Sequence, residues 1–450
     1  MIGENSFVSR LFGTDGVRGV ANHDLTPDLG LALGRAAGFV LAPGGGRVVT
    51  GRDTRLSGPM LEAALSAGLC SAGCEVLLGG VLPTPAVAFL TLAEEAAAGA
   101  VISASHNPVP DNGIKFFSPE GVKLPPDLEE AIERAMTSPP TDLPVGAAIG
   151  RVEPLEGGTD RYVAHLLDSV DGPLDGLEIV LDCAYGAAYS VAPRVFKAAG
   201  AKVHALHDEP DGSRINVGCG STSLALVSEA VVERGADFGL AFDGDADRVL
   251  AVDERGDTVD GDRIIALSAV RLSAQGKLHN NVVVSTVMAN LGFRRALQER
   301  GIEVLSAPVG DKHVAHEMAR SGAVLGGEQS GHIIWARHSS TGDGILTGLQ
   351  IAVAVSTATE PLSRLAGLYS SFPQVLINVE VGARDALAGA EGLWSEVQAA
   401  ESSLGDDGRV LLRASGTEPV VRVMVEATEA PVAQRTAETV ADAVRRHLAR

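Results

Sequence analysis

Residues 48–78 read VVTGRDTRLSGPMLEAALSAGLCSAGCEVLL, and this stretch shows the plan on which most of the chain is built. A short apolar run at 48–50 leads into a polar turn and then into a helix-like stretch from Pro59 to Ala72. Gly73 stands where the end of a helix favours a left-handed residue, and a strand-like run at 75–78 follows it. The pattern predicts a strand–helix–glycine–strand unit.

Residues 179–206 and 282–305 follow the same plan, with Gly200 and Gly301 in the place of Gly73. Short apolar strands that alternate with helices are typical of parallel strands covered on both faces by helices. We therefore predict an α/β fold with three similar mixed-sheet domains.

The C-terminal part has a different pattern. Strand-like runs at 375–381, 410–412 and 420–425 are combined with helix-like stretches at 386–402 and 431–450, which predicts a small α+β domain. Residues 138–158 are rich in Pro and Gly and are expected to form a linker. The predicted domains, arranged around a central cleft, are residues 1–148, 155–253, 254–368 and 373–450.

Composition excludes several classes of protein. The net charge of -21 and an aromatic share of 4% argue against binding to nucleic acid or to an anionic membrane. The four cysteines form no CxxC pair, which is typical of a reducing compartment. The uncharged run at 76–93 is broken by glycines and prolines, and the start of the chain shows no secretory signal, so we expect a cytoplasmic protein.

The most informative local signal is DGDADR at 243–248, directly after the strand-like run at 238–242. Asp243, Asp245 and Asp247 can converge on one hard cation, and so few ligands in a tight loop suit Mg²⁺. An EF-hand is the obvious rival, but its sixth position requires Gly and here is Arg248. The remaining alternative is a solvated acidic turn, which would crowd three like charges.

Four other polar loops are weaker signals. SASHNP at 103–108 follows a strand-like run and offers Ser105 at the edge where α/β proteins bind ligands. GGEQSGH at 326–332 suits a polyhydroxylated ligand, and RASGTEP at 413–419, with Arg422 after it, suits a phosphate group. The glycine-rich stretch at 12–19 carries Arg18. Each of these loops, taken alone, is also compatible with an ordinary turn.

Together these loops resemble those of the α-D-phosphohexomutase superfamily, and within it the bacterial phosphoglucosamine mutases. The resemblance rests on LFGTDGVRG at 11–19, SASHNPVPDNGIKFF at 103–117, FDGDADR at 242–248, GGEQSGH at 326–332 and RASGTEP at 413–419, in that order along essentially the whole chain. It implies the four-domain architecture that the repeat also predicts.

The resemblance also implies roles for individual residues. Ser105 would carry the transferable phosphoryl group and would bind one Mg²⁺ ion together with Asp243, Asp245 and Asp247. Further implied roles fall into three groups: proton transfer and charge next to the phosphoserine (Arg18, His106, Lys115, Arg248, His332), contact with the sugar (Glu328, Gln329, Ser330), and binding of the second phosphate (Arg413, Ser415, Gly416, Thr417, Arg422). Gln329 is the position that points to glucosamine.

The implied reaction is the isomerisation of glucosamine 6-phosphate and glucosamine 1-phosphate through a hexosamine 1,6-bisphosphate, which supplies UDP-N-acetylglucosamine for cell-wall synthesis. The expected partner is thus a small-molecule sugar phosphate, and the oligomeric state stays open. Three alternatives remain: a phosphomannomutase or phosphoglucomutase, a Mg²⁺-dependent phosphatase, and a non-catalytic sugar-phosphate sensor.

Overall fold

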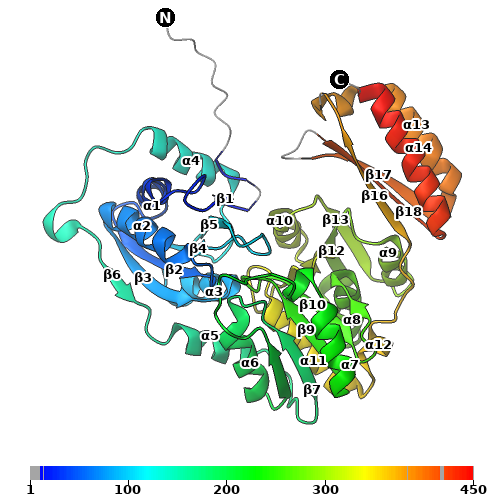
Figure 1. The fold of residues 1–450 in the computed structure, drawn as a ribbon, viewed down its shortest axis with the longest axis horizontal. Helices are drawn as coiled ribbons and strands as arrows, with labels where there is room; N and C mark the ends of the chain where they lie inside the picture. The colour runs from blue at the N-terminus through cyan, green and yellow to red at the C-terminus, as the bar shows by residue number, and fades with distance from the viewer. Residues whose placement is uncertain (1–10, 14, 383, 416–419, 449–450) are drawn as a thin grey trace, which may run out of the picture. The chain divides into compact units, whose positions relative to one another are not determined.

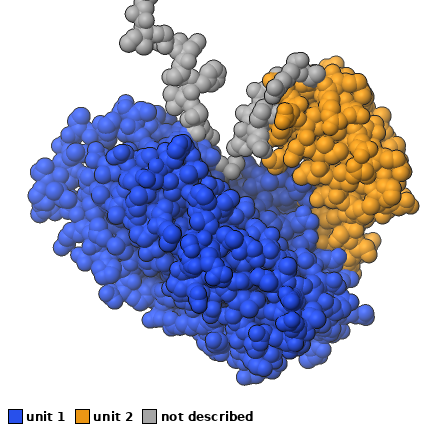
Figure 2. Space-filling view, in the orientation of Figure 1, with its two compact units in different colours: residues 1–288, 302–367 blue, residues 289–301, 368–450 orange. Residues whose placement is uncertain are grey.

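The structure is a computed structural model that describes residues 11–13, 15–382, 384–415 and 420–448 (Figure 1). The chain divides into two compact units, coloured separately in Figure 2. The larger unit comprises residues 1–288 and 302–367, and the smaller unit comprises residues 289–301 and 368–450. No helix among the described residues is long and apolar enough to cross a membrane.

The described residues of the larger unit form three sheets. The first has the order β1-β5-β4-β2-β3-β6, the second β11-β10-β9-β7-β8, and the third β13-β12-β14-β15. Their strands are β1 (Val17–Val20), β2 (Gly46–Arg52), β3 (Cys74–Val81), β4 (Ala98–Ile102), β5 (Asp111–Phe117), β6 (Val152–Pro154), β7 (Glu178–Asp182), β8 (Lys202–Leu206), β9 (Phe238–Phe242), β10 (Val249–Asp253), β11 (Thr258–Val259), β12 (Val282–Thr286), β13 (Glu303–Ala307), β14 (Leu325–Gly327) and β15 (Ile333–Trp335).

One four-stranded arrangement recurs in all three sheets. A first strand pairs in parallel with the second on one side and with the third on the other, as β2 does with β3 and β4. A fourth strand then runs antiparallel beside the third, as β5 does beside β4. The series β7, β8, β9, β10 and the series β12, β13, β14, β15 pair in the same way. The predicted fold class of three similar mixed-sheet domains is confirmed.

Helices pack on these sheets because each presents an apolar face. For example, α1 contributes Leu33, Ala36 and Ala37 to the same buried cluster as Leu61 and Leu65 of α2. The helices of the larger unit are α1 (Pro27–Leu41), α2 (Gly58–Ser71), α3 (Thr84–Ala93), α4 (Pro126–Thr137), α5 (Gly158–Leu167), α6 (Ala188–Ala198), α7 (Ala225–Arg234), α8 (Gly261–Ala274), α10 (Asp311–Ser321), α11 (Gly344–Ala358) and α12 (Leu362–Leu365).

The smaller unit contains the predicted C-terminal α+β fold, and it also includes residues 289–301, which the prediction assigned to the preceding domain. Within the part of this unit that the structure describes, an antiparallel sheet of order β16-β18-β17 is accompanied by three α-helices. The elements are α9 (Leu291–Gln298), β16 (Gln374–Glu380), α13 (Glu391–Leu404), β17 (Gly408–Ala414), β18 (Val420–Ala427) and α14 (Ala430–Leu448). A helix was expected from residue 386, but residues 384–389 form a 3₁₀ turn and α13 begins at Glu391. Gly389 explains the difference, because glycine disfavours the interior of an α-helix.

The buried helix α11 begins at an acidic cap in the middle of the larger unit. Asp343 is 1% exposed, and its carboxylate accepts hydrogen bonds from the backbone N–H of Leu346 (2.9 Å) and from the hydroxyl of Tyr162 on α5 (2.7 Å). Burial raises the pKa of Asp343 to about 6, because desolvation outweighs the hydrogen bonds that favour the charged form. The cap therefore holds α5 and α11 together with a carboxyl group that titrates unusually high.

This shift makes stability depend on pH. The folded protein holds the Asp343 proton more tightly than the unfolded chain does, so the free energy of unfolding should fall as the pH rises towards 6. Asp343→Asn removes the titration. Relative to the variant, the wild type should lose about 1 kcal/mol between pH 5 and pH 7.

Urea unfolding at several pH values tests this. The chain has two tryptophans, and Trp335 donates to the hydroxyl of Thr347 on α11 at 3.1 Å, so its fluorescence in a Trp394→Phe background reports on this region. A difference between variant and wild type that stays constant from pH 5 to pH 7 would contradict the assignment.

Candidate active site

Three loops of the larger unit occupy equivalent places in the three sheets. Each joins the third parallel strand to its antiparallel neighbour: residues 103–110 between β4 and β5, residues 243–248 between β9 and β10, and residues 328–332 between β14 and β15. The structure brings these loops together. The hydroxyl of Ser105 donates to Asp243 Oδ2 at 2.6 Å, and Arg248 forms a β-bridge with His332.

Ser105 is held in an uncommon backbone conformation. Its φ is +53°, in the left-handed region that residues with a side chain seldom adopt. The residue is 1% exposed, and its hydroxyl lies 3.2 Å from Nδ1 of His106 as well as against Asp243. The conformation thus presents the predicted nucleophile to the acidic loop.

The three aspartates of the acidic loop form a compact buried cluster. Asp243, Asp245 and Asp247 are at most 2% exposed, and one oxygen from each lies within 4.8 Å of the others. Among the described residues, nothing donates a hydrogen bond to Asp245 Oδ1 or to Asp247 Oδ1. Buried carboxylate oxygens without donors fit a hard cation such as Mg²⁺, so these residues could hold one.

The protonation of the cluster is uneven. Burial and the charges of Asp247 and Asp245 hold the pKa of Asp243 well above its usual range. The pKa of Asp247 lies well below its usual range, because Lys115 and His332 outweigh the effect of burial. Without a cation, the cluster therefore favours a proton on Asp243.

A second group of possible ligands has a different character. Asp182, His207 and Cys219 also lie within 4.8 Å of one another. However, the Asp182 carboxylate accepts the N–H groups of Ala184 (2.9 Å) and Gly220 (2.8 Å) and contacts the His207 ring. Burial raises the pKa of the Cys219 thiol to about 12. These contacts explain the group as a structural anchor for its loop.

Lys115 lies on β5 and faces the aspartates. Its ammonium group donates to Asp245 Oδ2 at 2.7 Å and lies 3.7 Å from Asp247 Oδ2, and the side chain is 3% exposed. Burial alone would lower its pKa, but Asp15, Asp245 and Asp247 raise it. The side chain is therefore a buried cation at the edge of the cluster.

Arg18, Arg248 and His106 lie around Ser105, as predicted. Arg18 donates to the backbone oxygen of Ala104 (3.3 Å) and the side-chain oxygen of Asn107 (3.1 Å), both in the Ser105 loop. Arg248 Nε lies 3.8 Å from Asp247 Oδ1. Burial, Arg248 and Arg18 lower the pKa of His106, so its ring favours the neutral form.

His332 is buried and both of its ring nitrogens are engaged. Nε2 accepts the N–H of Gly342 at 3.1 Å, and Nδ1 lies 3.6 Å from Asp247 Oδ2. A side chain at position 342 would meet the ring, since a Cβ there would lie 2.4 Å from it. His332 is thus fixed against the metal loop.

The loop predicted to contact the sugar forms a tight turn. Its closing hydrogen bond runs from the N–H of Gly331 to the carbonyl of Glu328. Glu328 accepts the N–H of Gly310 at 3.0 Å, and Ser330 is exposed. The Gln329 amide donates to Asp260 Oδ2 at 3.1 Å, and Asp260 is the N-cap of α8. Gln329 is thereby engaged within the protein, a contact that spacing in sequence does not reveal.

In the smaller unit, Arg413 and Arg422 are direct neighbours across β17 and β18. The N–H of Ser415 donates to the carbonyl of Val420 and closes the loop between these strands. Arginines at directly paired positions of two antiparallel strands project from the same face of the sheet, and arginine is suited to a bidentate contact with an anion. Gly416 and Thr417, predicted for the same site, lie outside the described residues.

Sequence reasoning missed three charged residues next to the site. Lys123 forms ion pairs with both Asp15 and Asp311, and Asp15 also contacts Arg18 and lies 3.9 Å from Lys115. Asp15 stands within the glycine-rich stretch at 12–19, but only the fold shows that it joins the network. Lys123 lies in a stretch without an individual signal, and Asp311, at the start of α10, was assigned no role of its own.

The comparisons with known proteins agree with this geometry. Four models of the phosphoglucomutase/phosphomannomutase family match the chain in order: alpha/beta/alpha domain I at residues 9–141, domain II at 160–256, domain III at 260–372, and the C-terminal domain at 376–443. The chain belongs to the phosphoglucomutase/phosphomannomutase family.

Curated relatives within this family carry a more particular name. A phosphoglucosamine mutase of Salinispora tropica is 52% identical over 97% of this chain and 99% of its own length. A phosphoglucosamine mutase of Moorella thermoacetica is 54% identical over 93% of this chain and 95% of its own length.

Solved structures share the fold. A phosphoglucomutase/phosphomannomutase family protein from Burkholderia thailandensis is 27% identical with a TM-score of 0.82, and the match covers 97% of both chains. The N-acetylphosphoglucosamine mutase of Aspergillus fumigatus, solved with GlcNAc-6P and magnesium, is 19% identical with a TM-score of 0.71, covering 97% of this chain and 96% of its own.

The raised pKa of Asp243 leads to a prediction about metal binding. Mg²⁺ binding requires the ionised carboxylate, so it should release a proton wherever the raised pKa keeps Asp243 protonated. The apparent affinity should weaken as the pH falls. Isothermal titration of the unphosphorylated protein in two buffers with different ionisation enthalpies measures the released protons.

Two variants make this test specific. Asp243→Asn should abolish proton release and weaken binding. Asp253→Asn is the matched control, because Asp253 ends β10 and accepts the N–H groups of Arg255 and Asp257, away from the cluster. Proton release that is unchanged in Asp243→Asn would show that another group carries the proton.

Proposed function

We propose that this protein is a phosphoglucosamine mutase that interconverts glucosamine 6-phosphate and glucosamine 1-phosphate through a phosphoserine at Ser105. The observation that carries the reaction is the hydroxyl of Ser105, 2.6 Å from Asp243 in the buried aspartate cluster that Lys115 also contacts. The amino sugar is supported by the names of the relatives that are 52% and 54% identical over nearly the whole chain.

The proposed reaction has two transfers. In the first, the O1 hydroxyl of glucosamine 6-phosphate attacks the phosphorus of phosphorylated Ser105. The bond between phosphorus and Ser105 Oγ breaks, O1 gives up its proton while Oγ takes one up, and glucosamine 1,6-bisphosphate results. The bisphosphate then reverses its orientation, and Ser105 removes the phosphoryl group from O6 to leave the 1-phosphate. No phosphate is consumed overall.

Such a transfer depends mainly on positioning and on neutralisation of charge. We assign one Mg²⁺ ion to Asp243, Asp245, Asp247 and the phosphoserine, where it would supply positive charge next to the transferring group. Arg18, Arg248 and His106 lie around Ser105 and would act on the same phosphoryl oxygens.

Lys115 is the better candidate for the general acid, because its charged ammonium group can donate a proton to the oxygen that leaves phosphorus. Its ammonium group donates to Asp245 at 2.7 Å and borders the cluster where the phosphoryl group would be transferred. His332 was the second candidate, but its Nε2 accepts a backbone N–H and its Nδ1 faces Asp247. We therefore assign proton transfer to Lys115 and a supporting role to His332.

The remaining predicted residues concern the parts of the substrate that do not react. We propose that Glu328 and Ser330 bind sugar hydroxyls, and that Gln329 influences the amine preference through the shape of this loop, since its amide is bonded to Asp260. In the smaller unit, we propose that one phosphate group is bound by Arg413, Ser415, Gly416, Thr417 and Arg422.

The alternatives are less well supported. A mutase specific for mannose or glucose phosphates would share the chemistry, but the relatives at more than 50% identity carry the glucosamine name. A non-catalytic sensor would not need a serine held at the acidic cluster. We further propose a cytoplasmic role in supplying UDP-N-acetylglucosamine for the cell wall.

A mutase assay tests the function. Purified protein with Mg²⁺ and a trace of glucosamine 1,6-bisphosphate is offered glucosamine, glucose and mannose 6-phosphates in parallel. We expect kcat/KM to be at least about tenfold higher for glucosamine, because an amine contact discriminates strongly against a hydroxyl. Preference for a neutral hexose would overturn the substrate, and steady release of inorganic phosphate would indicate a phosphatase.

Ser105→Ala tests the mechanism separately from the substrate. Loss of the nucleophile should lower kcat by at least about a thousandfold with every sugar phosphate. Mass spectrometry of the wild type after incubation with the bisphosphate should place one added phosphate on Ser105. An alanine variant with wild-type turnover would exclude the phosphoserine route.

A further inference from the structure

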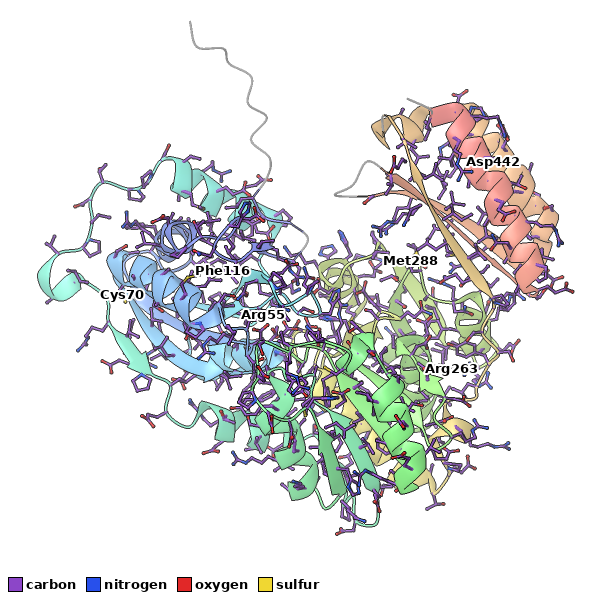
Figure 3. The ribbon with its side chains drawn as sticks, in the orientation of Figure 1. Arg55, Cys70, Phe116, Arg263, Met288 and Asp442 are labelled. Atoms are coloured by element: carbon purple, nitrogen blue, oxygen red, sulfur yellow. The ribbon has the colours of Figure 1, made fainter. Side chains whose placement is uncertain are left out.

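Arg55 follows β2 in a turn that the sequence marks only as polar, yet it is one of the largest fully buried side chains of the protein, at 0% exposure. Figure 3 labels it in the interior of the larger unit. Its Nε donates to Asp53 Oδ2 at 3.0 Å, so the charge has a partner that is equally buried. A buried guanidinium is costly unless all its donors are satisfied.

The other four N–H donors of Arg55 all reach one short segment, residues 105–111, which comprises the Ser105 loop and the first residue of β5. Nη2 donates to two of its backbone carbonyl oxygens and Nη1 donates to two more. The acceptors are the carbonyls of Ser105 (3.0 Å), Asn107 (2.8 Å), Pro108 (2.6 Å) and Asp111 (2.9 Å). With the bond to Asp53, all five guanidinium donors are used.

The N–H of Ser105 is connected to the same ion pair. It donates to the hydroxyl of Ser103 at 2.9 Å, and that hydroxyl donates to Asp53 Oδ2 at 2.6 Å. Asp53 in turn pairs with Arg55, which donates to the carbonyl of Ser105. The peptide groups on both sides of Ser105 are thus fixed by one buried pair.

Fixing these groups matters because the backbone of Ser105 is in the left-handed region, at φ +53°. This conformation is disfavoured for serine and persists only where surrounding contacts determine it. A change of φ at Ser105 would turn its hydroxyl away from Asp243, which it contacts at 2.6 Å. The contacts of Arg55 are those that oppose such a change.

We propose that Arg55 is a positioning residue for phosphoryl transfer: it holds Ser105 in the left-handed conformation that directs Oγ to the aspartate cluster. The inference rests on the proposed phosphoserine mechanism but not on which sugar is the substrate. Lysine could not replace arginine here, because its ammonium group has three donors at one point and cannot span carbonyls of four residues.

Asn216 supplies an independent contact to the same carbonyl. It lies in the segment after β8, and its Nδ2 donates to the carbonyl of Ser105 at 2.9 Å. Asn216 therefore assists in holding Ser105 without being part of the pair between Asp53 and Arg55. Its removal should reproduce the effect of losing Arg55 in a weaker form.

The test compares Arg55→Lys with the matched control Arg52→Lys. Arg52 ends the same strand, but its Nε pairs with Glu62 at 3.1 Å and not with the Ser105 loop. For Arg55→Lys we expect kcat to fall at least about a hundredfold while KM changes less than about threefold, because Arg55 serves alignment and not substrate binding. Arg52→Lys should retain both values.

A spectroscopic measurement separates positioning from a general loss of structure. The ³¹P NMR signal of phosphorylated Ser105 should shift or broaden in Arg55→Lys and in Asn216→Ala, and should stay in place in Arg52→Lys. Arg55→Lys with a wild-type signal and turnover overturns the proposal, as does a rise in KM without a fall in kcat.

Two complications, a variant that does not fold and a different preferred substrate, each have their own control. If Arg55→Lys fails to fold, the Asn216→Ala variant is the test. Turnover and a ³¹P signal in Asn216→Ala that equal those of the wild type then overturn the proposal. If the wild type prefers another hexose phosphate, the same variants are measured with that substrate, so an error in the substrate is distinguishable from an error about Arg55.

Discussion

The larger unit is organised around buried carboxylates that require positive charge. Asp245 and Asp247 both face Lys115, whose other neighbour is Asp15. Asp15 is shared with Lys123, which also pairs with Asp311 at the start of α10. Because a buried charge without a partner is strongly destabilising, each of these groups depends on the next. The charges that would handle a phosphoryl group therefore also join elements of all three sheets.

The same dependence explains where strain can be tolerated. Ser105 adopts a left-handed backbone that ordinary loops avoid, and it does so between the aspartate cluster and the pair formed by Asp53 and Arg55. The contact of the Ser105 hydroxyl with Asp243 and the contact of the Ser105 carbonyl with Arg55 both require this conformation. A loop held from one side only could relax, so the position of the nucleophile is a property of the whole unit.

Sequence patterns predicted the features that depend on neighbouring residues. They missed contacts between residues that are distant in the sequence and meet only in the folded chain. The strand–helix–glycine–strand pattern predicted the parallel pairs, and aspartates at alternate positions predicted their own cluster. Arg55 stood in a stretch described only as a polar turn, since no pattern shows that four distant carbonyls will meet one guanidinium. Gln329 was expected at the sugar, and its bond to Asp260 depends on where the N-terminus of α8 lies. Such contacts follow from tertiary packing and cannot be derived from spacing.

The repeated sheets explain why the framework could be predicted from the sequence and the contacts of the site could not. In each of them the chain leaves the third strand in a loop before the antiparallel fourth. That loop carries the proposed nucleophile in one sheet, the proposed metal ligands in the next and the proposed sugar-binding residues in the third. The repeated framework supplies equivalent positions, while the chemistry lies in loops whose sequences differ completely. A search for sequence similarity between the repeats therefore finds the framework and overlooks the site. The site becomes visible where two loops touch, as Ser105 touches Asp243 and Arg248 pairs with His332.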